Sequence, residues 1–359
     1  MNEYISHLNV KELQQDLINW YNKVKRDLPW RENLDPYRIL VSEIMLQQTQ
    51  VVTVIPYFKR FMALFPTTKQ LAEADEQTLL KAWEGLGYYS RARNLQESAR
   101  MIEALGQFPT TYEGILKLKG VGPYTAGAIG SIAFSLATPA VDGNVFRVIS
   151  RVCCIFEDIG KAKTRKTFET VVADIISREN PGDFNQGLME LGATICKPKS
   201  PKCLECPIRN YCQAYEQGVD ELLPVKSKTG KQTKVKFVVG IVQNQYGELL
   251  IQKRPNYGLL ANFYELKSFE YQGEVEPQEL LIHNLTEAGY QVESIQPIGT
   301  FNHPFSHRIW EMESYKVVAH VDLTTSGVIG EGEELWIKPS HLQDYPLAVA
   351  HLKILSHDS

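Results

Sequence analysis

The sequence predicts a multidomain protein in which an all-α domain is followed by a smaller α+β domain. With 359 residues, the chain exceeds the usual length of one domain. Apolar residues recur at helical spacing from Lys11 to about Tyr215, and strand-like apolar runs begin at Lys234. We therefore expect an all-α domain at 1–216, a polar, lysine-rich linker at 217–233 and an α+β domain at 234–359.

Several short helices, rather than one long coiled coil, are expected in the first domain. Residues 11–28 and 36–65 carry the helical pattern most clearly. Proline lacks the N–H that continues a helix, so prolines are expected to interrupt the pattern. The prolines placed to do so are Pro29, Pro56, Pro66 and Pro109.

Strands and one helix are expected in the second domain. The segments VKFVVGIV (235–242), GELLIQKR (247–254) and YKVVAHV (315–321) have the composition of strands. The segment PQELLIHNLTEAGY (277–290) predicts a helix that ends at Gly289.

The bulk composition is that of a soluble globular protein, with 43% hydrophobic and 22% charged residues. No apolar run reaches the roughly 18 residues that a membrane span needs. The first residues lack the build of a signal peptide, so we expect a cytoplasmic protein. The net charge of −4 says nothing for nucleic acid, and the lysine run at 226–236 fits a solvated linker as well as a binding surface.

Four cysteines predict a metal site. Cys196, Cys203, Cys206 and Cys212 follow the pattern C-x6-C-x2-C-x5-C within 17 residues. Four thiolates this close can bind either a tetrahedral zinc ion or an iron–sulfur cluster, and the spacing does not choose between them. Cys153 and Cys154 lie in an apolar run and are expected to be core thiols.

A tight turn between two helices is expected at Gly120, Val121 and Gly122. Glycines remove the Cβ atoms that would keep a ligand from the backbone, and Pro123 suits the first turn of a helix. The exposed N–H groups of such a turn can bind a phosphate of DNA. A plain helical hairpin with no ligand is the alternative.

Two carboxylates occur in apolar surroundings. Glu43 lies among isoleucines and leucines, where burial would raise its pKa and make it a proton donor. Asp142 precedes Gly143 and Asn144 at the start of an apolar run. Glu43 could instead lie on an exposed helix face, and Asp142 could be only a helix cap.

The motifs together resemble the helix-hairpin-helix DNA glycosylase superfamily, and most closely its adenine DNA glycosylases of the MutY type. The resemblance rests on SEIMLQQTQV (42–51), LKGVGPYTAGAI (118–129), VDGNVFRV (141–148), FNQGLMELGATIC (184–196) and the cysteine loop. It implies hydrolysis of adenine from duplex DNA that pairs adenine with 8-oxoguanine or guanine. It also implies a [4Fe-4S] cluster in preference to zinc, and a monomer that reaches the bacterial-type nucleoid through its DNA.

The resemblance also implies roles for individual residues. Glu43 would protonate adenine at N7, and Asp142 would stabilise or trap the oxocarbenium ion of the sugar, as in glycoside hydrolysis. Tyr124 and Asn144 would assist by hydrogen bonding. Because Tyr124 stands where endonuclease III-type enzymes have a Schiff-base lysine, a monofunctional enzyme is expected.

The remaining implied roles concern the two bases and the backbone. A flipped adenine needs a pocket, and an amide such as that of Gln186 can pair with an adenine edge. The pocket residues implied are Trp30, Arg31, Leu46, Val51, Gln186 and Met189. The residues implied at the opposite base, as wedge or close neighbours, are Gln48, Thr49, Leu86 and Tyr88, with Gly120, Val121 and Gly122 at a DNA phosphate.

The C-terminal domain resembles a Nudix fold without its hydrolase activity. Where the Nudix box would lie, residues 282–290 retain only Glu287 and Gly289 of its pattern, too few carboxylates for the magnesium ions of pyrophosphate hydrolysis. The resemblance makes it a reader of 8-oxoguanine through Phe305, Ser306 and His307. Alternatives for the whole chain are a bifunctional glycosylase/lyase and a DNA-binding protein without catalysis.

Overall fold

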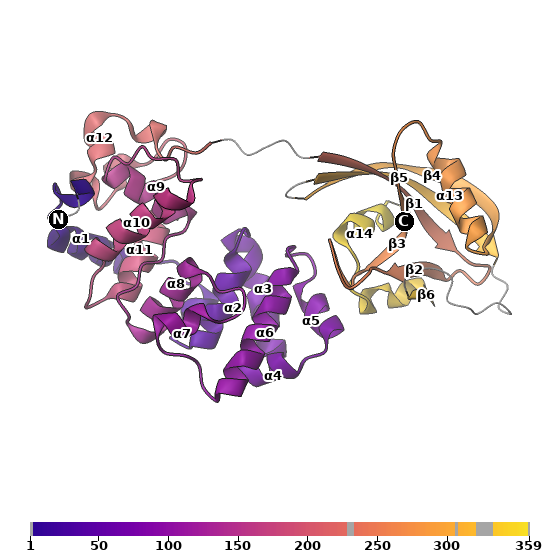
Figure 1. The fold of residues 1–359 in the computed structure, drawn as a ribbon, viewed down its shortest axis with the longest axis horizontal. Coiled ribbons are helices and arrows are strands. Elements are labelled where there is room, and N and C mark those ends of the chain that lie inside the picture. The colour runs from indigo at the N-terminus through magenta and orange to yellow at the C-terminus, as the bar shows by residue number, and fades with distance from the viewer. Residues whose placement is uncertain (1–2, 228–232, 306–307, 321–332, 358–359) are drawn as a thin grey trace. The chain divides into compact units, whose positions relative to one another are not determined.

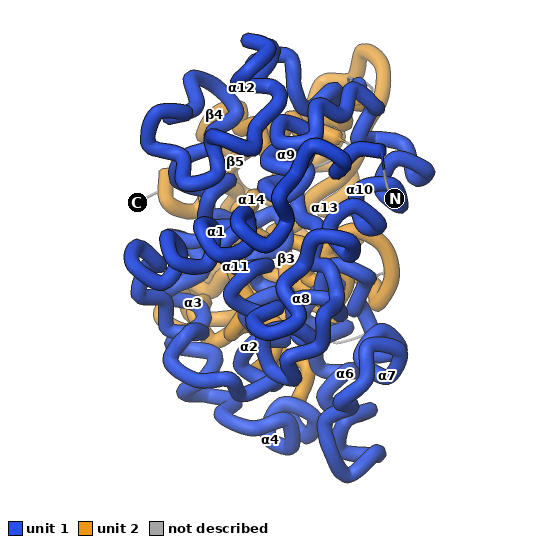
Figure 2. The backbone as a smooth tube through the Cα atoms, turned by 90° about the vertical axis from the view of Figure 1, so that its left-hand side faces the viewer, with its two compact units in different colours: residues 1–74, 90–228 blue, residues 75–89, 229–359 orange. Residues whose placement is uncertain are grey.

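The computed structural model describes residues 3–227, 233–305, 308–320 and 333–357. Two compact units emerge, and Figure 2 shows them in different colours. Unit 1 comprises residues 1–74 and 90–228, and unit 2 comprises residues 75–89 and 229–359. Among the described residues, no helix is both long and apolar enough to cross a membrane.

Unit 1 is built from helices, as Figure 1 shows. Its α-helices are α1 (Val10–Val24), α2 (Pro36–Leu46), α3 (Val51–Leu64), α4 (Thr68–Glu73), α6 (Ser90–Leu105), α7 (Tyr112–Leu116), α8 (Pro123–Phe134), α9 (Gly143–Val152), α10 (Ala162–Ile175), α11 (Pro181–Thr194) and α12 (Gln213–Gln217). A short 3-10 helix, η2 (Pro29–Arg31), precedes α2. The expected series of short helices is therefore confirmed.

One expected break is wrong, because Pro56 lies inside α3 and does not end it. Proline at this position removes the hydrogen bond to the carbonyl one turn earlier, at Val52. Val52 is 71% exposed, so water can satisfy that carbonyl. Pro29 and Pro109, by contrast, lie at or before helix starts, and Pro66 follows the end of α3.

The core of unit 1 joins helices that are distant in sequence. Leu17 of α1, Phe146 of α9, Phe168 of α10 and Phe184 of α11 are buried in one cluster. Cys153 belongs to the same cluster and is a core thiol as expected. The same expectation for Cys154 is wrong, since that residue is only partly buried, at a positive φ just after α9. The core thus fixes α9 and α11 beside each other.

Unit 2 contains a mixed six-stranded sheet in the order β4-β5-β1-β3-β2-β6. β1 pairs in parallel with β5, while its other neighbours are antiparallel. The elements are α5 (Glu76–Trp83), β1 (Thr233–Gln243), β2 (Leu249–Lys253), β3 (Tyr264–Tyr271), α13 (Pro277–Glu287), β4 (Gln291–Pro304), β5 (Arg308–His320), β6 (Glu334–Ile337) and α14 (Val349–Leu355). The expected strands and helix all form, and Gly289 follows α13 at a φ of 85°.

The sheet separates two apolar layers. Successive side chains of a strand point to opposite faces, so Val238 and Val239 of β1 enter different clusters. Val238 packs with Leu281 and Leu285 of α13. Val239 packs with Ile354 of α14. One helix therefore covers each face, as in the α+β domain that the sequence predicts.

Gly127 of α8 is a close contact that the fold of unit 1 needs. A Cβ atom there would lie 1.9 Å from the carbonyl oxygen of Pro139, in the segment that leads to Asp142. We predict that Gly127→Ala lowers the free energy of unfolding by about 1–3 kcal/mol or more, as overpacking does. Denaturant or thermal unfolding measures this effect.

Gly143→Ala is the matched control, because a Cβ atom at Gly143 would meet no heavy atom within 4 Å. Its unfolding midpoint is expected to stay close to that of the unaltered protein. Equal stability of the two variants would contradict the assignment of Gly127 as a tight contact.

Candidate active site

One large cavity in unit 1 gathers most of the residues singled out from the sequence. Its volume is about 1020 Å³. Helices α2, α8, α9 and α11 and the short helix η2 contribute to its walls. The predicted residues that line it are Glu43, Tyr124, Asp142, Asn144, Trp30, Arg31, Leu46, Val51, Gln186, Met189, Gln48 and Thr49.

Glu43 lies near the end of α2 and is buried. Burial raises the pKa of Glu43 to about 7, and the nearby Asp142 carboxyl adds to the rise. The Tyr124 hydroxyl donates a hydrogen bond of 2.7 Å to Glu43 Oε2, and this bond and Arg31 both act to lower the pKa. A carboxyl group with a pKa near 7 can hold and release a proton at neutral pH.

Asp142 is the N-cap of α9. Its Oδ1 accepts from the backbone N–H of Val145 at 2.8 Å, and its Oδ2 accepts from Asn144 Nδ2 at 2.8 Å. Burial raises the pKa of Asp142, although the hydrogen bonds from Val145 and Asn144 and the charge of Arg147 lower it. The capping donors therefore favour the ionised form, but burial outweighs them and the net pKa is raised.

A close helix contact supports the Asn144 side of this arrangement. A Cβ atom at Gly192 of α11 would lie 2.5 Å from the Cβ of Asn144, so glycine lets α11 approach α9. Arg147 Nη2 donates to Asn144 Oδ1 at 2.8 Å and to the Gly192 carbonyl at 2.9 Å. Asn144 is thereby held with its amide nitrogen toward Asp142.

A second wall of the cavity combines η2 with α11. Arg31 Nε donates to Gln186 Oε1 at 3.2 Å, and Arg31 Nη2 donates to Glu190 Oε2 at 2.9 Å. Arg26 also contacts Glu190. Sequence reasoning missed Arg26 and Glu190, although Glu190 follows Gln186 by one helical turn and so shares its face.

The segment after α2 has unusual backbone geometry. Gln48 has a φ of 57°, a left-handed conformation that costs energy for any residue other than glycine. Arg91 Nη1 donates to the carbonyls of Ile44 and Met45 at 3.0 Å and so holds the end of α2. Such strain at Gln48 is typical of positions with a functional role.

Two residues implied at the opposite base lie in unit 2. Tyr88 has a φ of 49° and is 46% exposed, whereas Leu86 is buried. Tyr88 therefore has both a strained backbone and an exposed aromatic ring. Gln48 also has a strained backbone, and its side chain lines the cavity.

The glycine turn forms the expected hairpin between α7 and α8. Gly120 has a φ of 75°, and a Cβ atom there would lie 2.7 Å from Asn94 Cβ. Gly122 caps α8 without a side-chain hydrogen bond, and a Cβ atom on it would meet nothing within 4 Å. Val121 is buried between them. The outer face of the turn is therefore open to a ligand.

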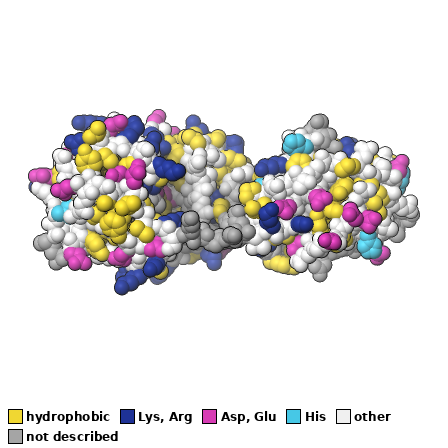
Figure 3. Space-filling model, turned by 90° about the horizontal axis from the view of Figure 1, so that it is seen from above, with side chains coloured by type: hydrophobic (Ala, Val, Ile, Leu, Met, Phe, Trp, Pro, Cys, Tyr) yellow, Lys and Arg dark blue, Asp and Glu magenta, His cyan; other side chains and the backbone are white. Residues whose placement is uncertain are grey.

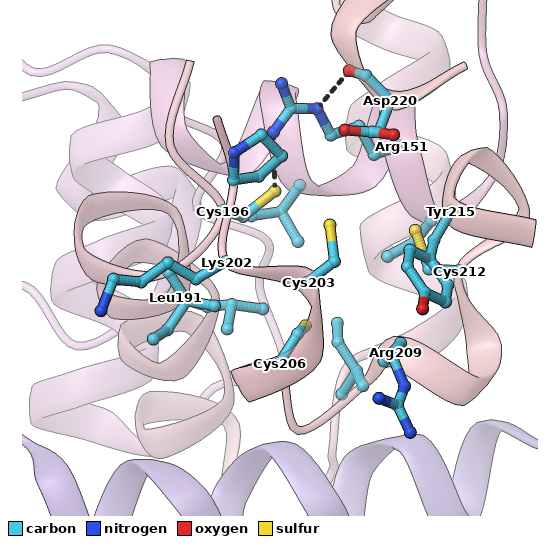
Figure 4. Close-up of a pocket in the computed structure, with 15 residues that line it drawn as sticks. Arg151, Leu191, Cys196, Lys202, Cys203, Cys206, Arg209, Cys212, Tyr215 and Asp220 are labelled. Atoms are coloured by element: carbon cyan, nitrogen blue, oxygen red, sulfur yellow. Dashed lines mark hydrogen bonds between the residues drawn. The ribbon is translucent and has the colours of Figure 1, made fainter. Parts of the chain in front are cut away.

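The four cysteines of the predicted metal site line one small cavity, shown in Figure 4. Cys203 and Cys206 come from a 3-10 helix and its end, and Cys212 precedes α12. Arg151 Nη1 lies 3.2 Å from Cys196 Sγ, where its charge can stabilise a thiolate. Burial raises the pKa of Cys206 to about 12.

Four cysteines that line one cavity are suitable ligands for a tetrahedral zinc ion or for an iron–sulfur cluster.

Phe305 is the part of the predicted reader loop that the structure describes. Its ring makes edge-to-face contacts with His303 and Trp310, each at 4.8 Å between centroids. Ser306 and His307 lie outside the described residues.

Figure 3 shows Lys and Arg side chains in several separate groups, with acidic and apolar side chains between them. On this face, the described Lys and Arg side chains thus form separate groups rather than one basic field.

Comparisons with known proteins cover both domains. Family models match at residues 41–174 for the "HhH-GPD superfamily base excision DNA repair protein", at 196–212 for the "Iron-sulfur binding domain of endonuclease III" and at 238–357 for the "NUDIX domain". The match at 196–212 confirms the expected iron–sulfur cluster, whose ligands would be Cys196, Cys203, Cys206 and Cys212.

Two curated relatives are adenine DNA glycosylases. The Schizosaccharomyces pombe protein is 32% identical, and the match covers 97% of this chain and 89% of that protein. The Arabidopsis thaliana protein is 34% identical over 85% of this chain, which spans only 57% of that longer relative. Among solved structures, a thermostable thymine-DNA glycosylase matches 58% of this chain and 97% of its own, with 30% identity and a TM-score of 0.52.

The hydrogen bond between Tyr124 and Glu43 leads to a testable shift in pKa. The bond favours the ionised carboxylate, so Tyr124→Phe is expected to move the pKa of Glu43 above about 7. Carbon NMR of labelled glutamate side chains measures the change. Tyr37→Phe is the control, because Tyr37 donates to the Phe65 carbonyl and does not line the cavity.

The metal site predicts iron in the purified protein. Anaerobically prepared protein is expected to be coloured and to contain about four iron atoms per chain, as a [4Fe-4S] cluster requires. Cys206→Ser should lose both colour and iron, whereas Cys154→Ser should keep them because Cys154 lies outside the ligand set. Stoichiometric zinc in a colourless protein would contradict the cluster.

Proposed function

Because the chain belongs to the adenine DNA glycosylase family, we propose that it hydrolyses the N-glycosidic bond of adenine opposite 8-oxoguanine or guanine in duplex DNA. The observation that carries this proposal is a pair of carboxyl groups in one cavity, with Asp142 partly buried and Glu43 buried at a pKa of about 7. Among the described residues, this cavity also holds an aromatic ring, an amide and a guanidinium suited to a planar base.

The proposed reaction begins with the base outside the helix. Flipping costs a few kcal/mol of stacking, which contacts in the pocket offset. Protonated Glu43 gives its proton to N7 as the bond between C1′ and N9 breaks, so the bonding electrons leave with neutral adenine. The Asp142 carboxylate stabilises the cationic sugar, and water then adds to C1′ while its proton passes to a carboxylate.

Tyr124 and Asn144 orient the two carboxyl groups in this scheme. Tyr124 donates to Glu43 and Asn144 donates to Asp142, each through one short hydrogen bond. Because a tyrosine cannot form a Schiff base, hydrolysis without strand cleavage follows. The iron–sulfur cluster would act as a structural centre that orders the loop from Cys196 to Cys212, with no part in bond breaking.

Recognition of the opposite base is proposed for Gln48, Thr49, Leu86 and Tyr88, together with Phe305, Ser306 and His307. The strained backbones of Gln48 and Tyr88 support a role for those two. Gly120, Val121 and Gly122 would bind a DNA phosphate through the open face of their turn. Action as a monomer on nucleoid DNA in a bacterial-type cytoplasm belongs to the same proposal.

The deciding experiment measures adenine release from duplexes that pair adenine with 8-oxoguanine, guanine or thymine. Release from the first two, without strand cleavage or borohydride trapping, is the expected result. Glu43→Gln should abolish release, because the amide cannot supply the proton, while binding to the 8-oxoguanine duplex persists.

Two outcomes would defeat the proposal. Strong trapping with strand cleavage would indicate a bifunctional lyase, and binding without release by the unaltered protein would indicate a non-catalytic lesion binder. Normal turnover by Glu43→Gln would remove Glu43 from the role of acid.

A further inference from the structure

Glu190 of α11 is a buried carboxylate that the proposed reaction does not use. Its side chain is 1% exposed. Two guanidinium groups contact it: Arg26 Nη2 at 3.2 Å and Arg31 Nη2 at 2.9 Å from Oε2. These contacts offset burial and leave the pKa of Glu190 lowered, so the group is ionised at neutral pH. Desolvation offsets much of the attraction in a buried ion pair, so net stability does not explain why this one is present. We therefore looked for another role for Glu190.

The guanidinium group of Arg31 makes three hydrogen bonds, one from each of its nitrogens. Besides Glu190, Arg31 Nη1 donates to the carbonyl of Arg26 at 3.1 Å, and Nε donates to Gln186 Oε1 at 3.2 Å. A guanidinium presents its N–H groups in a fixed fork, so anchoring two nitrogens also sets the direction of the third. Glu190 and the Arg26 carbonyl therefore aim the Nε–H group at Gln186.

The direction of the Arg31 Nε–H group determines which end of the Gln186 amide faces Arg31. An amide can present either its oxygen or its NH2 group, but Arg31 can only donate, so the oxygen must face Arg31. In the described part of the chain, Gln186 Nε2 donates no hydrogen bond. Gln186 lines the cavity, and its NH2 group is therefore the end that remains for a ligand.

We propose that Glu190 is a positioning residue for base recognition: by holding Arg31, it fixes the Gln186 amide with its NH2 group presented to the base. The pocket then selects a base that offers a hydrogen-bond acceptor at this point, as the ring nitrogens of adenine do. Preorganisation of this kind avoids the cost of ordering the amide when the base enters. The inference rests on the proposed function, since it assumes that adenine occupies this cavity.

A double-mutant cycle tests whether Glu190 acts through Gln186. Glu190→Gln is expected to slow single-turnover adenine release by about tenfold or more, while affinity for the uncleaved duplex stays unchanged. In a Gln186→Leu background, which has no amide to orient, Glu190→Gln should cause little further loss. Glu179→Gln, an exposed change just before α11, controls for the loss of one negative charge.

Gln186→Glu tests the donor assignment without disturbing Glu190. The new carboxylate still accepts from Arg31 but offers no N–H to the base, so release should be slower than in the unaltered protein. Release by Gln186→Glu at the rate of the unaltered protein would overturn the assignment. This variant also serves if Glu190→Gln fails to fold, as thermal unfolding would show.

The outcomes distinguish failure of the proposed function from failure of the role assigned to Glu190. If the unaltered protein releases no adenine, the proposed function fails. If it releases adenine but the losses from Glu190→Gln and Gln186→Leu multiply, Glu190 acts independently of Gln186 and this inference alone fails.

Discussion

The burial of one ionisable group, Glu43, is the constraint on which the chemistry of unit 1 depends. The residues beside it in α2, from Ile39 to Met45, are buried, so the helix cannot turn Glu43 toward water without exposing them. Burial favours the protonated form of the carboxyl group and raises its pKa. Tyr124 and Arg31 oppose that effect, and the result is a group that exchanges its proton near neutral pH. The helices around the cavity can be understood as the means of holding these opposing influences at fixed distances.

Asp142 combines an observed structural role with the chemical role that we propose for it. Its Oδ1 closes the first turn of α9, which fixes the carboxyl group in space. Its Oδ2 accepts only from the side chain of Asn144 among the hydrogen bonds described, and the residue remains on the cavity wall. The cap that is observed is therefore compatible with the reacting group that is proposed. The cap supplies the rigidity that an electrostatic stabiliser requires.

Local patterns were sufficient for the helical character of unit 1 and for β1, β2 and β5, because those features depend on nearby sequence. Asp142, for example, is visible as a cap from its neighbours alone. Most residues of the cavity were instead expected from the resemblance to the glycosylase family. Arg26, Glu190 and Arg91 escaped detection because their partners lie far away in sequence, up to 164 residues for Arg26. β6 and the parallel pairing of β1 with β5 likewise arise only from the packing of the sheet. Pro56 was misjudged because the exposure of Val52 is a tertiary property.

The parallel pairing of β1 and β5 has a consequence for synthesis on the ribosome. Thr233 of β1 lies beside Arg308, so the centre of the sheet is incomplete until the chain has grown by roughly another 75 residues. The helices that form the cavity and the cysteine loop end before β1 begins. The growing chain can therefore complete the cavity of unit 1 while the β-sheet is still being made. Slow translation of the final third would lengthen the period in which β1 has an unpaired edge, and the charged residues Lys234 and Lys236 on that strand are the kind that discourages pairing with other chains.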